Sequence, residues 1–192
     1  MDTVYDRLMT KHRILHFFFL SLIVVLFVTT SCTSMQTLPE PKDVHLIRNV
    51  PFYEQEAYQC GPASLSNVLN YWGIRVTPEQ IAEEIFSKSA RGTLTIDMIL
   101  YAQRAGLRAE QYRGDIGDIK KKISGGFPLI VLVDYGFSFY KQHHFMVIVG
   151  YAEQGVIVHS GKTREKLIPW NDFMKTWEKT EYWTLLVKKS KQ

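Results

Sequence analysis

The apolar residues of this chain change their spacing near Gly125-Gly126, and this change limits the possible folds more than any other feature. Before the two glycines, apolar residues recur at intervals of three and four, which places them on one face of a helix. After them come short continuous runs rich in Val, Ile and Leu, which are typical of buried strands. Helices first and antiparallel strands second predict an α+β domain.

Local signals predict where the elements begin and end. Cys60-Gly61-Pro62 suits a first helical turn, because the N–H group that proline lacks has no partner there. Thr77, Pro78 and Gln80 form a capping box at the start of a second helix. Thr95 is expected to cap a third helix. These three helices end near residues 73, 86 and 106, and two further helices are expected over 116–123 and 170–177. Extended chain is expected over 43–50 and a loop over 87–92. The expected strands are 107–112, 128–133, 144–150, 156–158, 166–168 and 182–187.

The chain is long enough to bury a core of its own. Its 192 residues are 46% hydrophobic and 13% aromatic, which suits one domain with a short tail. The formal net charge is only +4, and the two basic runs, Lys120–Lys122 and Lys188-Lys189, favour solvated surface over a nucleic-acid site. We therefore expect no nucleic-acid partner, and two cysteines imply no disulfide framework.

The N-terminus has the composition of an export signal. Basic residues within the first 13 positions precede an apolar run over 14–28, and small residues then lead to Cys32. This order describes a secretory signal peptide, and the run is shorter than the roughly 20 residues of a membrane-spanning helix. Thr30-Ser31-Cys32 resembles the lipobox of bacterial lipoproteins, which implies that Cys32 is lipidated and becomes the first residue of the mature protein.

We therefore expect a lipoprotein-type signal peptide over 1–31, a lipidated Cys32 with a flexible tether over 32–42, and a folded domain over 43–192. The domain would be anchored to a bacterial membrane in the cell envelope, facing the periplasm or the exterior. An uncleaved membrane anchor is the alternative. A Cys32–Cys60 disulfide is the alternative to lipidation. If Cys32 carries lipid, Cys60 is a single free thiol in an exported domain, which indicates reactivity.

Cys60 stands where a predicted helix begins, and we interpret it as a catalytic nucleophile. Unpaired backbone N–H groups and the positive end of the helix dipole meet at this position. Both favour the thiolate, which is the nucleophilic form of cysteine. Gly61 would let the backbone approach the group that Cys60 attacks.

A thiol nucleophile needs a base, most often a histidine that is distant in sequence. His143 and His144 begin the strand that runs to Gly150. Since side chains alternate along a strand, we expect only one of the two to face the cleft. A histidine at a strand start is more often structural, so the pairing with Cys60 is what indicates a catalytic role.

Two motifs carry a resemblance to a known family. The run from Gln59 to Ala63, QCGPA, and the run from His144 to Tyr151, HFMVIVGY, resemble the bacteriocin-processing cysteine peptidases, which cleave leader peptides after a double glycine. The similarity extends from about Val50 to Val187. It implies a papain-like cysteine peptidase domain in a stand-alone lipoprotein form, with helices that carry the nucleophile followed by an antiparallel sheet that carries the histidine. Cys60 is then the nucleophile and His144 the base.

The resemblance also implies a glutamine that holds the oxyanion shortly before the nucleophile. Gln55 is the candidate, although Glu54 occupies the spacing that is usual in the family. Gln59, adjacent to Cys60, is the fallback. An ordinary loop position for Gln55 is the alternative.

The third catalytic member departs from the family, which places an aspartate where Ser160 stands here. The Ser160 hydroxyl could accept the imidazole N–H, but it supplies no charge. His159 in the orienting role is a second possibility, and a surface position is its alternative. Asp172 and Asn171 could reach His144 only if the intervening chain folds back. We expect lower efficiency rather than lost activity, because thiolates need less assistance than hydroxyls.

The expected reaction is hydrolysis of a peptide bond through an acyl-enzyme, with a peptide or protein as substrate. No metal or other cofactor is expected, because the scattered histidines and one free cysteine form no ligand set. The missing acid supports a rival reading, an inactive lipid-anchored protein that binds peptides or an envelope partner. A second rival is an envelope amidase or transpeptidase that uses the same pair of residues.

Overall fold

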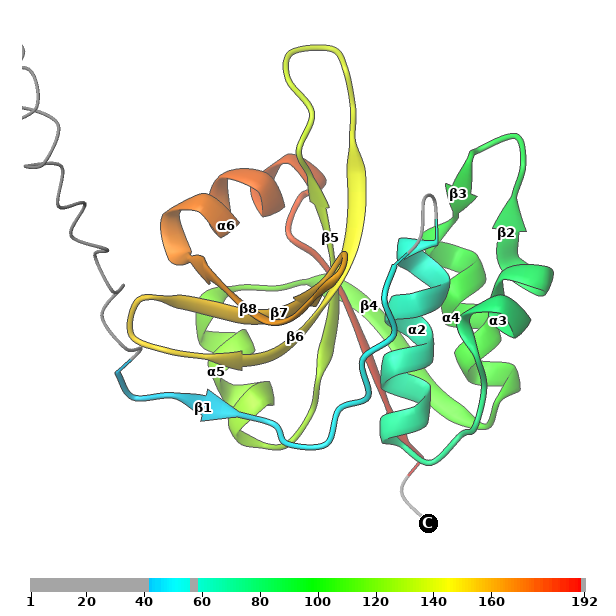
Figure 1. Cartoon of the computed structure of the whole chain (residues 1–192), viewed down its shortest axis with the longest axis horizontal. Coiled ribbons are helices and arrows are strands. Elements are labelled where there is room, and N and C mark those ends of the chain that lie inside the picture. The colour runs from blue at the N-terminus through cyan, green and yellow to red at the C-terminus, as the bar shows by residue number, and fades with distance from the viewer. Residues whose placement is uncertain (1–41, 56–58, 191–192) are drawn as a thin grey trace, which may run out of the picture. The chain divides into compact units, whose positions relative to one another are not determined.

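The computed structural model describes residues 42–55 and 59–190, which belong to one unit, Pro41–Gln192 (Figure 1). The predicted signal peptide, Cys32 and most of the tether lie outside the described residues and remain predictions. Within the unit, three helices precede the main strands, which then alternate with two short helices. The α+β prediction is confirmed.

The first helices carry the start of the candidate site. The predicted capping box is present: the Thr77 hydroxyl accepts from the Gln80 N–H, and the Gln80 side chain accepts from the Thr77 N–H. Among the described residues, no helix is long and apolar enough to cross a membrane. The helices of this part are α2 (Cys60–Tyr71), α3 (Pro78–Ile85) and α4 (Thr95–Arg104).

Two details of this part differ from the prediction. Thr95 is the first residue of α4 rather than its cap; the N-cap is Leu94, without a side-chain hydrogen bond. The stretch that we expected to be a loop contains the turn of a small hairpin, formed by β2 (Phe86–Ser87) and β3 (Gly92–Thr93). The hairpin could not be predicted, because strands of two residues show no period in the sequence.

The main sheet has seven strands, all paired antiparallel. Its order is β4-β9-β5-β6-β7-β8, and the short β1 pairs with the end of β6. The predicted strands all occur, with boundaries that differ by a few residues. They are β1 (His45–Leu46), β4 (Leu107–Arg113), β5 (Leu129–Asp134), β6 (His143–Tyr151), β7 (Gly155–Ser160), β8 (Thr163–Pro169) and β9 (Trp183–Lys189).

The sheet separates two hydrophobic cores. Along β6, Phe145, Val147 and Val149 pack into the core with α2, α3 and α4, whereas Met146 and Ile148 pack into the core with α5 (Ile116–Ser124) and α6 (Trp170–Trp177). Figure 1 shows these helices on opposite faces of the sheet. Among the residues that the structure describes, the buried members of both cores lie between positions 50 and 187.

Candidate active site

A cleft opens at the N-terminal end of α2, between the β2–β3 hairpin and the β5–β6 connection. It encloses about 710 Å³ and is lined by Cys60, His144 and Gln55, among others. The fold therefore brings together the first candidates for nucleophile, base and oxyanion donor from the sequence analysis. One wall of the cleft is formed by residues 90–94 of the β2–β3 hairpin, and the other by residues 140–142 of the β5–β6 connection.

Cys60 is the first residue of α2 and is partly buried. Burial raises the pKa of its thiol, although backbone hydrogen bonds at Phe145, Gly61 and Cys60 itself act in the opposite direction. Burial therefore opposes the thiolate that the helix end favours, because the anion is removed from water. The contact with Phe145 also brings the thiol to the strand position next to His144.

His144 lies on β6 and is partly buried, and its ring is 5.8 Å from that of Tyr135 between centroids. Burial, and to a smaller extent the positive charge of Lys166, lowers the pKa of His144 to about 4. Its imidazole is therefore neutral near pH 7. His143 lines the cleft too, contrary to the expectation that only one neighbour would, but it is exposed.

Ser160 contacts the imidazole at the position where the resemblance leads us to expect an acid. The distance between His144 Nε2 and Ser160 Oγ is 2.9 Å. When Nε2 carries the ring proton, it donates to Ser160 Oγ, and Nδ1 is the nitrogen left to act as a base. A hydroxyl can hold the ring in this orientation, but it does not stabilise the imidazolium by charge.

The other residues considered for orienting His144 are occupied elsewhere. His159 is buried, its Nδ1 accepts from the Glu165 N–H at 3.2 Å, and its Nε2 lies 3.3 Å from the Val50 carbonyl. With both ring nitrogens engaged, His159 cannot orient His144, and it is not a surface residue either. Asp172 is 65% exposed and lies 4.0 Å from Lys175, so no fold-back of the chain brings this carboxylate to the cleft.

Gln55 reaches the cleft, but its amide is already engaged. Its Oε1 accepts from the Gly161 N–H at 3.0 Å, while Nε2 lies 3.3 Å from Ser64 Oγ and 3.4 Å from the Phe145 carbonyl. The backbone N–H of Gln55 also donates to the Gly161 carbonyl. These bonds hold the β7–β8 turn beside the first turn of α2. An oxyanion role for Gln55 stays a prediction and requires Nε2 to exchange one of these acceptors for substrate.

The packing of β3 explains why position 61 is a glycine, which the sequence alone did not reveal. A Cβ at this position would lie 2.7 Å from Thr93 Cβ, so only glycine lets β3 pack against the start of α2. Thr93 Oγ1 is buried and has no hydrogen-bond partner among residues 42–55 and 59–190. This wall of the cleft was missed by sequence reasoning, because no motif marks residues 90–94.

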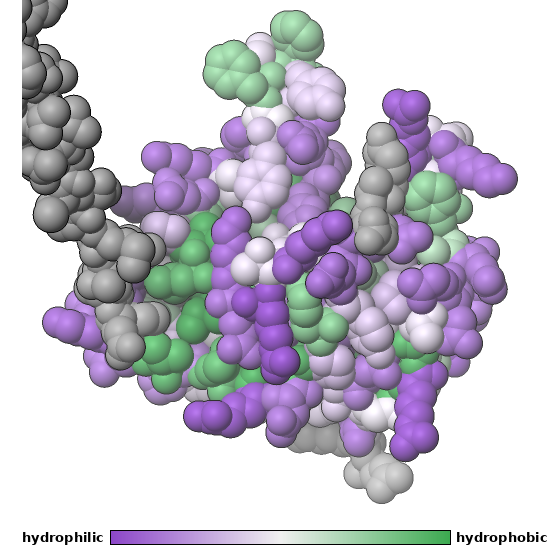
Figure 2. Space-filling view, in the orientation of Figure 1, coloured by the Kyte–Doolittle hydropathy of each residue, from purple (hydrophilic) through white to green (hydrophobic). Residues whose placement is uncertain are grey.

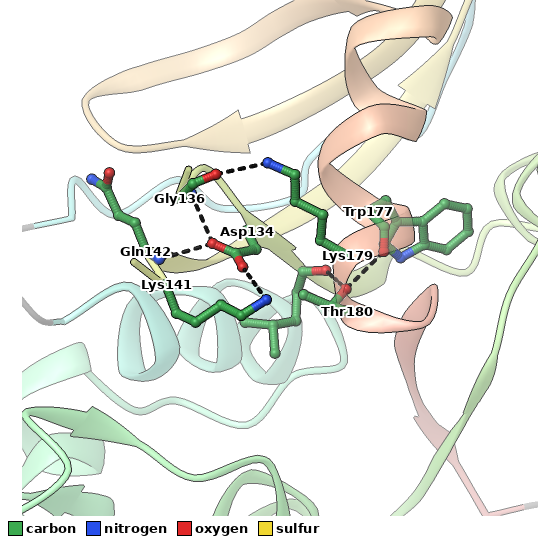
Figure 3. A network of polar contacts seen from close by, with 8 residues as sticks. Asp134, Gly136, Lys141, Gln142, Trp177, Lys179 and Thr180 are labelled. Atoms are coloured by element: carbon green, nitrogen blue, oxygen red, sulfur yellow. Dashed lines mark hydrogen bonds and ion pairs between the residues drawn. The ribbon is translucent and has the colours of Figure 1, made fainter. Parts of the chain in front are cut away.

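A buried carboxylate holds the opposite wall. Asp134 Oδ1 accepts from the backbone N–H groups of Gly136 and Gln142, both at 2.8 Å, and Oδ2 lies 3.4 Å from Lys141 Nζ (Figure 3). Lys179 donates to the Gly136 carbonyl at 2.7 Å. Burial acts to raise the pKa of Asp134, but the backbone donors and Lys141 together hold it below its usual value. The network fixes the base of the β5–β6 connection, which lines the cleft.

Three solved structures are similar to this chain. A candidate C39-like peptidase from Bacillus anthracis gives a TM-score of 0.64 at 17% identity, over 79% of this chain and 100% of that chain. A double glycine motif protease from an AMS/PCAT transporter, in complex with the leader peptide, gives 0.61 at 25% identity, over 78% and 98%. The peptidase domain of Streptococcus ComA gives 0.60 at 16% identity, over 72% and 97%. The predicted papain-like fold is confirmed.

Sequence comparisons agree with the fold. An uncharacterized protein from Methanothermobacter thermautotrophicus is 31% identical over 103 residues, which is 54% of this chain and 65% of that protein, less than two thirds of its length. The model of the Peptidase C39 like family matches residues 47–184, a range that contains Cys60, His144 and Ser160. The chain belongs to the Peptidase C39 like family.

Proposed function

We propose that this protein is a cysteine peptidase that hydrolyses peptide bonds with Cys60 as nucleophile and His144 as base. The observation that carries the proposal is the shared cleft: Cys60 begins α2, His144 lies on β6, and Ser160 contacts the imidazole at 2.9 Å. Family membership and the peptidase folds of the similar structures support the same reaction.

In this proposal the two groups of the cleft start as a neutral pair. Because burial raises the pKa of Cys60 and lowers that of His144, the resting state is thiol and imidazole. As Sγ attacks the substrate carbonyl carbon, the thiol proton passes to His144, and the carbonyl oxygen gains the negative charge. Exclusion of water by the bound peptide strengthens the interaction between the charges that form.

The oxyanion lies near the N-terminal end of α2, where the backbone N–H of Cys60 is a donor. Gln55 adds a second donor if Nε2 turns from its present acceptors. The imidazolium then gives its proton to the leaving amine, and the thioester remains on Cys60. Water, deprotonated by neutral His144, hydrolyses the thioester and restores the thiol.

The test is peptide cleavage together with mass spectrometry of the acylated protein. Cys60→Ser should abolish the thioester, and His144→Ala should reduce kcat by about 10²- to 10⁴-fold. His45→Ala is the matched control, because this histidine stacks on Tyr151 at 4.6 Å and does not line the cleft. Cleavage that survives Cys60→Ser, or that is equally slow in His144→Ala and His45→Ala, would refute the assignment.

An inactive peptide-binding protein is the second candidate function. Its support is specific: Ser160 stands where the resemblance implies an acid. Burial, and to a smaller extent the positive charge of Lys166, disfavours the imidazolium that catalysis requires. An envelope amidase or transpeptidase would use the same chemistry with a different substrate or acceptor. Peptides that bind without any acyl-enzyme would favour the binding protein, and product analysis with an added amine acceptor would identify a transpeptidase.

We also propose that the protein is lipidated on Cys32 and held at a bacterial cell envelope, facing the periplasm or the exterior. The support is the N-terminal sequence, a basic segment and an apolar run over 14–28 before Cys32. Metabolic labelling with a fatty-acid analogue should mark the full chain and not Cys32→Ser. Labelling that is equal in both would overturn this part of the proposal and leave the peptidase assignment intact.

A further inference from the structure

The connection between β5 and β6 exposes aromatic side chains at its tip. Phe137 is 87% exposed and Phe139 95% exposed, and they lie between Tyr135 at 44% and Tyr140 at 67%. Figure 1 shows this connection projecting beyond the rest of the unit, and Figure 2 shows apolar side chains gathered at its end. Single exposed apolar residues are ordinary, but a protruding group of four aromatic rings indicates a surface that binds something.

Hydrogen bonds at the base of the loop fix the tip in its projecting position. Asp134 bonds the backbone at Gly136 and Gln142, so one carboxylate closes both ends of the loop (Figure 3). Lys179 holds the Gly136 carbonyl, and a turn within the tip joins the Tyr140 N–H to the Phe137 carbonyl at 3.1 Å. A loop that is already ordered loses little conformational entropy when it binds.

We propose that this aromatic tip, residues 135–140, inserts into the surface of a lipid bilayer. Its chemistry is ordered by polarity: the two phenylalanines stand at the end and the tyrosines flank them. Phenylalanine suits the boundary of the acyl chains, and tyrosine suits the headgroup level. No acidic residue interrupts positions 135–142, and the net charge of the chain is +4, which favours an anionic bilayer.

Area argues against a protein partner at the tip. A fully exposed aromatic side chain offers about 150–250 Å², so the exposed fractions of these four leave about 440–730 Å² to bury. A stable protein interface needs about 800 Å² from each side. Phe137 and Phe139 do not line the cleft, so a peptide bound beside Cys60 would not cover them. A bilayer needs no complementary surface and accepts a narrow wedge.

The length of chain between Cys32 and the described unit is compatible with contact between the tip and a bilayer. Residues 32–41 span at most roughly 35 Å when extended, so a lipid on Cys32 would hold the unit within reach of the bilayer. Stable membrane attachment usually needs two signals, and the tip supplies one that does not depend on the lipid. Because residues 140–142 line the cleft, insertion of the adjoining tip would place the cleft beside the membrane surface.

The experiment is co-sedimentation of unit 41–192 with vesicles of phosphatidylethanolamine and phosphatidylglycerol, and with neutral phosphatidylcholine vesicles. This unit is compact by itself and contains both hydrophobic cores of the described residues. Wild type should sediment with the anionic vesicles. The double variant Phe137→Ser/Phe139→Ser should lose about tenfold or more in partitioning, with an unchanged Tm because both side chains are almost fully exposed.

Two variants complete the design. Ile96→Ser removes another exposed apolar side chain, 49% exposed on α4, and should bind vesicles like wild type. Cys60→Ser should also bind like wild type, so the result does not depend on the proposed catalysis. The proposal is overturned if wild type stays in solution with every vesicle, or if the double variant sediments equally. It is overturned as well if the phenylalanines promote self-association without lipid, or alter only KM for a peptide.

Discussion

Replacing Ser160 by aspartate should shift the neutral Cys60–His144 pair toward an ion pair. At present the imidazole nitrogen lies 2.9 Å from a hydroxyl, and burial with Lys166 holds the pKa of His144 at about 4. A carboxylate at Ser160 would stand beside the same Nε2–H. It would favour the imidazolium, and the imidazolium in turn favours the thiolate of Cys60.

The magnitude follows from the contact distance. Two opposite charges 4 Å apart attract by about 4 kcal/mol at an effective dielectric constant near 20. Part of this is offset by desolvation of the new carboxylate, which leaves about 2–3 kcal/mol. Since about 1.4 kcal/mol is a factor of ten in a protonation equilibrium, the imidazolium population near neutral pH should rise by about 30- to 140-fold. Most of the imidazole would still be neutral at pH 7.

The assay is the rate of Cys60 alkylation by iodoacetamide from pH 5 to 10. Wild type should react mainly at alkaline pH, because burial raises the pKa of the thiol. Ser160→Asp should react at lower pH and also cleave peptides faster. Ser160→Asn is the matched control, since it has the shape of aspartate without the charge and should keep the wild-type profile.

Two results would refute this reasoning. If Ser160→Asp and Ser160→Asn give the same pH profile, the charge at this position does not reach the imidazole. If wild type already alkylates rapidly below the ordinary thiol pKa of about 8.5 and His144→Ala abolishes this, the resting pair is already ionic.

Three further predictions concern stability, each measured by urea unfolding. The pKa of His144 is about 4 in the folded state and about 6.5 in the unfolded state, so the unfolded state binds more protons between these pH values. The free energy of unfolding should therefore fall by at most about 3 kcal/mol from pH 7 to pH 4. It should fall by less in His144→Gln. Gly61→Ala should destabilise by about 1–3 kcal/mol, because its Cβ would lie 2.7 Å from a side-chain carbon of β3, whereas Gly92→Ala has room and should cost less than 1 kcal/mol; equal effects would contradict the packing argument. Thr77→Ala should cost about 1 kcal/mol through loss of the capping box, while Thr95→Ala, which caps nothing, should change little; a larger loss at Thr95 would count against the observed helix start.

Much of the fold could be predicted from spacing alone. The runs around Leu129 and Val147 are apolar at every position, which is how strands read when both faces are buried. The capping box at Thr77 needs only residues within one turn, so sequence suffices to find it. Thr95 has the same type of side chain at a helix start, yet the backbone there begins at Leu94, and no local signal distinguishes the two cases.

The candidate site divides in the same way. Cys60 at a helix start and His144 at a strand start could be recognised, because each depends on its own neighbours in sequence. The contact between His144 and Ser160 could be anticipated only through the family spacing. The engagement of both His159 nitrogens could not, since one partner, Val50, is far away in the chain.

The sequence by itself determined the helices and strands, the motif-bearing residues and the family, because periodicity and short motifs are local properties of a chain. Only the tertiary structure decided the direction in which the pKa values of Cys60 and His144 shift, since desolvation depends on what distant segments place around a group. The tertiary structure also explains why residue 61 must be glycine and why Asp134 is buried. Those answers lie in contacts across the fold, with Thr93 in one case and with the backbone at Gln142 in the other.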